Sequence, residues 1–63
     1  MISSLEIVKV TEDFEGEVLY IHPVRESDNR ALIDTYKFNL ELRAAAVYKL
    51  NSNQYFIREV ETV

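Results

Sequence analysis

The only histidine, His22, is the residue best suited to proton transfer or metal binding near neutral pH. It precedes Pro23, the only proline, and Glu26 follows four residues later. Because the proline interrupts helical spacing, the side chains of His22 and Glu26 are not expected to face one another. One histidine without any cysteine does not make a zinc site. We therefore predict no metal site, and a half-exposed His22 at the end of a strand.

Nucleophiles and cofactor-binding loops are also missing from the sequence. There is no cysteine, and none of the serines lies in a nucleophile-elbow motif. The single glycine, Gly16, cannot build a phosphate-binding or dinucleotide-binding loop. The 11 acidic residues contain no pair set apart by its spacing. We therefore expect no enzymatic activity, no catalytic residues and no cofactor.

Acidic residues surround one phenylalanine near the N-terminus. The cluster consists of Glu12, Asp13, Phe14, Glu15 and Glu17. Such a surface accelerates association with a basic protein. A narrower hypothesis is that it imitates the DNA backbone. The alternative is a solvated loop tip that keeps a hairpin from pairing edge to edge. Phe14 is not needed to form a turn; we expect it to fold back as a plug, with an interface anchor as the alternative. We predict that the cluster binds a protein partner.

A second candidate segment for binding is the apolar run Tyr55, Phe56 and Ile57. If it forms an edge strand, a twofold-related copy can add its own strand there; otherwise it is buried within a barrel. A different class of function is binding of single-stranded nucleic acid by aromatic stacking, assisted by Lys37 and Arg43. The net charge of −4 opposes that function, because phosphates attract a positive surface.

The first part of the chain reads as a hairpin. Residues 5–10 are rich in β-branched side chains, residues 11–16 form a polar turn closed by Gly16, and residues 17–22 form a second strand. In that strand Val18, Leu19, Tyr20 and Ile21 are consecutive, although successive strand residues point to opposite faces. The strand is therefore expected at the centre of a closed barrel or covered by a partner, unless one apolar face is exposed.

Two structures compete for residues 31–50. Residues 36–43 alternate apolar and polar side chains, which is typical of a strand, and we favour that interpretation. A helix is favoured by the three consecutive alanines at 44–46 and by an apolar stripe at three- and four-residue spacing. Ser27 would be its N-cap. The helix would leave Phe38 and Leu42 in water, which forfeits about 3–6 kcal/mol of burial.

The last segment reads as strand, turn and strand over residues 47–50, 51–53 and 54–60. The predicted fold is therefore a small all-β, barrel-like domain of about five strands. The alternative is an α+β fold, with a helix over about 28–50 packed on a three-stranded antiparallel sheet.

The whole chain of 63 residues is short enough for a single domain, 1–63, and 48% of it is hydrophobic, which favours a packed core. It carries no signal-peptide pattern and no apolar run long enough to span a bilayer, and the absence of cysteine fits a reducing compartment. We expect a cytoplasmic, non-enzymatic, regulatory protein-binding module without membrane or nucleic-acid partners. We also expect it to form a homo-oligomer, because so short a chain has difficulty covering its apolar strands.

Overall fold

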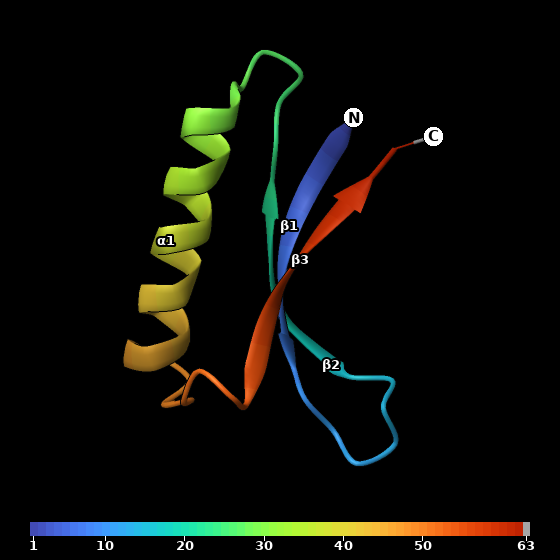
Figure 1. Cartoon of the computed structure of the whole chain (residues 1–63), viewed down its shortest axis with the longest axis vertical. Coiled ribbons are helices and arrows are strands. Elements are labelled where there is room, and N and C mark those ends of the chain that lie inside the picture. Colours follow the sequence, from blue (N-terminus) through green and yellow to red (C-terminus); the bar gives the residue numbers. More distant parts are fainter. Residues whose placement is uncertain (63) are drawn as a thin grey trace.

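The computed structural model describes residues 1–62 and shows an open sheet with one helix on it (Figure 1). The elements are β1 (Ile2–Lys9), β2 (Glu17–Pro23), α1 (Arg30–Ala46) and β3 (Tyr55–Glu61). The three strands are antiparallel in the order β2-β1-β3, and α1 packs against β1 and β3. The predicted five-stranded barrel is therefore wrong, whereas the alternative α+β fold is confirmed.

Helix α1 forms where the alternating pattern favoured a strand. Asn29 caps its start by accepting a 2.9 Å hydrogen bond from the backbone N–H of Leu32, two residues beyond the predicted cap at Ser27. Its inner face buries Ile33, Leu40 and Ala44 against the sheet. The helix explains the alanines and stops before residues 47–50, so the strand predicted there is also wrong.

Two large apolar side chains on the outer face of α1 are exposed to water, as the sequence analysis expected for a helix. Phe38 is 59% exposed and Leu42 is 54% exposed. The small size of Ala44, which is fully buried, lets the helix lie close to the sheet while Leu40 fills the core. The helix is therefore selected by the residues it buries, although two large side chains remain in water.

The register between β1 and β2 resolves the consecutive apolar residues of β2. Ile7 pairs with Tyr20 but Val8 pairs with Val18, so Leu19 is the extra residue of a β-bulge. Leu19 and Tyr20 both pack against the core beneath α1. Val18 and Ile21 consequently lie on the opposite face, and β2 is an edge strand rather than the centre of a barrel.

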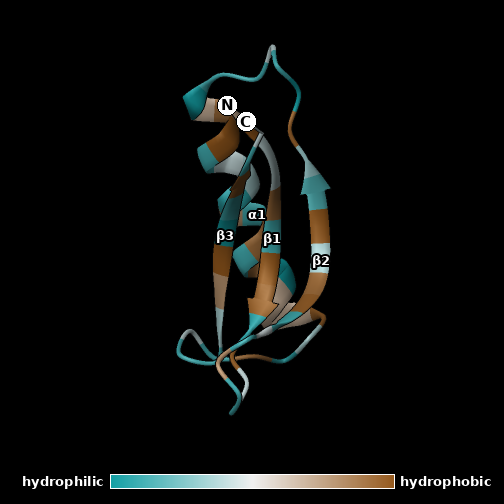
Figure 2. Cartoon of the chain, turned by 90° about the vertical axis from the view of Figure 1, so that its right-hand side faces the viewer, coloured by the Kyte–Doolittle hydropathy of each residue, from teal (hydrophilic) through white to brown (hydrophobic). Residues whose placement is uncertain are grey.

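One face of the sheet has no helix over it, as Figure 2 shows with α1 behind the strands. Leu5 and Ile7 point toward α1, so strand alternation places Glu6 and Val8 on the uncovered face. On the same face, exposed apolar side chains lie on the two strands beside β1: Val18 and Ile21 on β2 and Phe56 on β3. Glu6 forms a salt bridge with Arg58 in the middle of this face, with Arg58 Nε 2.7 Å from a Glu6 carboxylate oxygen.

The two-layer architecture makes the molecule thin. Its accessible surface is 4651 Å², against about 4,200 Å² expected for a folded chain of 7.4 kDa. Its radius of gyration is 11.9 Å, against about 10.6 Å for this length. The excess surface belongs to a molecule whose sheet is covered on one side only.

Candidate protein-binding site

The turn between β1 and β2 is built by its own side chains. Thr11 Oγ1 donates a 2.5 Å hydrogen bond to an Asp13 carboxylate oxygen, which also accepts from the backbone N–H of Glu15 at 3.2 Å. The Gly16 N–H in turn donates to Thr11 Oγ1 at 3.0 Å. The bond from Thr11, followed by that from Glu15, lowers the pKa of Asp13, because both bonds favour the charged carboxylate. The turn is therefore an ordered, negatively charged loop.

Gly16 brings this turn onto the uncovered face of the sheet. Its φ is +80°, and a Cβ at this position would lie 2.6 Å from Cγ1 of Val8. Only glycine combines that backbone conformation with so close an approach. The approach helps to explain why Val8 is fully buried on a face that has no helix over it.

Phe14 extends into solvent from the same turn. Its side chain is 96% exposed, so the expectation that it folds back as a plug is wrong. Phe14 also has a left-handed backbone, with φ of +64°, a conformation that costs a residue with a Cβ about 1–2 kcal/mol. The conformation of the turn is therefore unfavourable in two ways: the backbone of Phe14 is strained, and its large apolar side chain lies in water.

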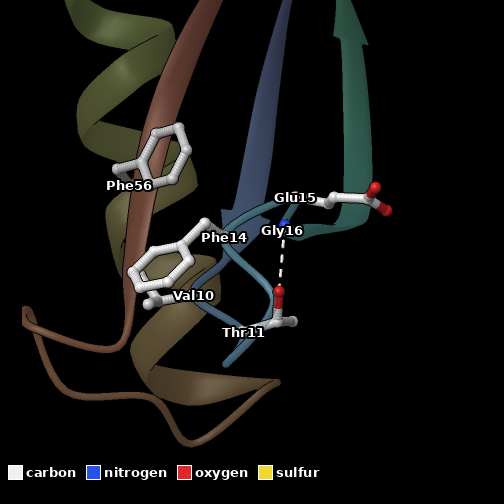
Figure 3. Close-up of a pocket in the computed structure, with 6 residues that line it drawn as sticks. All are labelled: Val10, Thr11, Phe14, Glu15, Gly16 and Phe56. Atoms are coloured by element: carbon white, nitrogen blue, oxygen red, sulfur yellow. Dashed lines mark hydrogen bonds between the residues drawn. The ribbon is translucent and has the colours of Figure 1, made fainter.

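An open pocket of about 180 Å³ lies beside Phe14 (Figure 3). It is lined by Val10, Thr11, Phe14, Glu15, Gly16 and Phe56. The Glu15 carboxylate extends away from the two aromatic rings. A cavity of roughly 150 Å³ accepts a benzene molecule in another protein, so the volume here suits one aromatic or large aliphatic side chain.

Phe56 enters this pocket from the other predicted binding segment. The Val10 N–H donates a 2.9 Å hydrogen bond to the Gln54 carbonyl oxygen, and this pairing brings the start of β3 beside the turn. The sequence contains no local signal for that contact, because the two segments are more than forty residues apart. Tyr55 and Ile57 instead pack against the core under α1.

The acidic residues of the turn give the site its charge. Glu12, Asp13, Glu15 and Glu17 are all exposed. Every salt bridge found within residues 1–62 lies elsewhere, on α1 and on the strands beside it. The apolar pocket therefore lies beside a turn whose four carboxylates take part in none of these salt bridges.

The basic residues expected to assist nucleic-acid stacking do not share a strand face. Lys37 and Arg43 lie on α1, where Lys37 pairs with Glu59 and the Arg43 guanidinium lies 4.2 Å from the centre of the Tyr20 ring. Both cations are thus engaged within the molecule. The barrel surface that this function required is absent from the described residues.

His22 lies near the end of β2 and is half-buried, which agrees with its predicted half-exposed position at a strand end. Its ring centre lies 4.5 Å from that of Tyr36, whose hydroxyl donates a 3.3 Å hydrogen bond to Asp28. Burial, then the charge of Asp28, raises the pKa of Tyr36. His22 Nδ1 is buried without a hydrogen-bond partner in the described structure. Residues 1–62 contain no cluster of three or more side chains suited to hold a metal ion.

Comparisons with protein-family models, with curated proteins and with solved structures found no match to this chain. In the described part of the chain, no helix has the length and apolar character needed to cross a membrane.

Proposed function

We propose that this chain is a small, non-enzymatic, regulatory module that binds a basic segment of another protein through the turn between β1 and β2. The observation that carries the proposal is Phe14, which is almost fully exposed and held in a strained conformation beside an apolar pocket. Strain of this kind persists at binding sites, where it presents a side chain in advance. Phe14 is the anchor, and the pocket accepts an apolar side chain of the partner.

Charge specifies the chemistry of the partner. Four carboxylates lie within six residues of sequence around Phe14, in a chain whose net charge is −4. A basic segment gains long-range attraction to this turn, whereas a second copy of the same turn is repelled. The occupant is therefore a lysine- or arginine-rich segment with one large apolar residue, and not another copy of this chain.

An inhibitor that imitates DNA is a narrower form of the same proposal. It would use the same carboxylates and would bind a nucleic-acid-binding protein. The exposed Phe14 distinguishes the two forms, because a phosphate mimic requires charge and gains little from an aromatic anchor. The cysteine-free composition fits a reducing compartment, and we place the interaction in the cytoplasm.

Selection from a phage-displayed random peptide library tests this proposal with a defined probe. We expect selected peptides to combine basic residues with an aromatic or large aliphatic residue. Phe14→Ala is expected to weaken their affinity by about tenfold or more, the range of an interface anchor. Glu15→Gln is expected to reduce affinity mainly at low salt, because surface charges are screened by added ions.

Two matched variants control for loss of any phenylalanine or any acid. Phe38→Ala removes another exposed phenylalanine, and Glu26→Gln removes an exposed acid outside the turn. Neither change is expected to alter peptide affinity. Selection of acidic peptides, or of peptides that bind Phe14→Ala as well as the natural chain, would contradict the proposal.

A further inference from the structure

The outer edge of β3 is the second interaction surface of the molecule. We propose that β3 pairs antiparallel with β3 of a second copy, across a twofold axis that passes through Ile57. The two three-stranded sheets would then form one continuous sheet with both helices on the same face. This inference goes beyond the binding of a basic segment at the turn.

The backbone of β3 offers a row of groups for this pairing. The bond from the Val10 N–H to the Gln54 carbonyl oxygen shows that even-numbered residues of β3 direct their backbone groups toward β1. Since these directions alternate along an antiparallel strand, Tyr55, Ile57 and Glu59 direct theirs outward. Within residues 1–62, no strand lies on that side of β3.

Two of the three charged side chains of β3 are already paired with charges of the same chain. Arg58 is paired with Glu6, and Glu59 is paired with Lys37 and with Arg30, whose Nη1 lies 2.9 Å from a carboxylate oxygen. The opposite edge is better protected: β2 contains the bulge and ends at Pro23, and both features oppose addition of a strand. The edge of β3 is therefore the one that admits a partner strand.

Side-chain charge also bears on the register of the pair. An axis at Ile57 places Phe56 opposite Arg58 of the second copy, where the guanidinium can lie over the ring, and Tyr55 opposite Glu59. An axis one residue later places two Arg58 side chains opposite each other, and an axis at Glu59 opposes two carboxylates. Like charges directly opposite one another disfavour a strand pair, here only weakly, because Arg58 and Glu59 are each paired within their own chain.

The position of the acidic turns is compatible with this dimer. The turn lies at the end of the sheet where β3 begins, as Figure 1 shows. Because antiparallel pairing reverses the second copy, its turn lies at the opposite end of the joined sheet. The two groups of carboxylates therefore stay apart.

Amide hydrogen exchange of the full chain, followed by NMR over a range of protein concentrations, tests the pairing. The outward amides of Tyr55, Ile57 and Glu59 are expected to exchange more slowly as concentration rises. Above the dissociation constant, each tenfold increase in concentration should slow them by about threefold, as mass action on a dimer requires. The outward amide of Ile21 on β2 is the matched control and should exchange at the same rate throughout. Sedimentation should give twice the mass of 7.4 kDa.

A monomeric mass up to millimolar concentration would overturn the proposal, as would protection of Ile21 in place of the β3 amides. Ile57→Pro removes one outward N–H without removing a bond to β1, and is expected to abolish the dimer. If that variant fails to fold, the exchange rates of the natural chain still show whether β3 pairs with a second copy. Phe14→Ala is expected to weaken peptide binding without changing the edge of β3. Each of the two proposals can therefore fail without the other.

Discussion

Phe14 combines two properties that folding alone does not favour. Its ring gains nothing from burial, because it is 96% exposed, and its backbone adopts a conformation that suits glycine or asparagine. The hydrogen bonds of Thr11 and Asp13 fix the turn and so maintain this conformation. The residue is therefore expected to lower stability while supporting binding.

Replacing Phe14 by asparagine separates these two effects. Asparagine tolerates a positive φ, so Phe14→Asn is expected to raise the free energy of unfolding by about 0.5–1 kcal/mol while abolishing peptide binding. Urea denaturation measures the stability. Phe14→Ala is the control, since it removes the ring without relieving the backbone. A Phe14→Asn variant less stable than Phe14→Ala would contradict the assigned strain.

Glu59 provides a residue whose effect depends on pH. The hydrogen bond from Lys37, aided by Arg30, lowers the pKa of Glu59 although partial burial opposes this shift. A carboxyl group with a lowered pKa stabilises the fold above its unfolded pKa of about 4.3, and this contribution is lost as pH falls through the lowered value.

Lys37→Met is therefore expected to reduce the free energy of unfolding at neutral pH by less than about 1 kcal/mol, because both side chains are partly exposed. The difference from the natural chain should vanish in acid, well below pH ~4. Denaturation at both pH values measures it, with Lys49→Met as the control for loss of a cation. A difference that persists in acid would show that Lys37 acts through packing alone.

Helix α1 has two apolar faces with different roles. The inner face includes Leu40, which is 2% exposed, and the outer face includes Leu42, which is 54% exposed. Leu40→Ala is expected to destabilise the fold by about 2–5 kcal/mol, because it empties part of the core. Leu42→Ala is expected to cost less than about 1 kcal/mol. Thermal unfolding of the two variants compares them, and equal losses would mean that the helix is rotated from the position described.

The sequence predicts the sheet elements better than the helix. The strands expected over 5–10, 17–22 and 54–60 correspond to β1, β2 and β3, since β-branched and aromatic residues mark them and turn residues separate them. The alternation of residues 36–43 favoured a strand, which is wrong, and the tertiary burial of Leu40 and Ala44 favours the helix instead. The bulge at Leu19 has no local signature.

The candidate site also has some features that the sequence predicts and others that depend on contacts between distant residues. The acidic residues of the turn are visible in the sequence as a cluster. The exposure of Phe14 is not visible in the sequence, because it depends on the backbone conformation of the turn. The contribution of Phe56 to the pocket depends on the pairing of β1 with β3, which joins distant parts of the chain. Composition therefore indicates the charge of the site, and only the fold gives its shape.

The whole molecule is a thin, two-layer unit, and the two interaction surfaces that we propose lie at separate places. The acidic turn lies at one end of the sheet, and the unpaired edge of β3 runs along its side. The accessible surface exceeds that expected for the mass, because the sheet is covered on one side only. In this account stability comes from the core under α1, whereas binding uses residues that the core does not need.

An NMR titration of the full chain with a selected basic peptide tests the central claim most directly. The amide signals of Val10, Phe14 and Phe56 are expected to shift on binding, and that of Leu42 on the outer face of α1 should stay in place. Shifts concentrated on α1, with the turn unaffected, would contradict the assignment of this turn as the docking site.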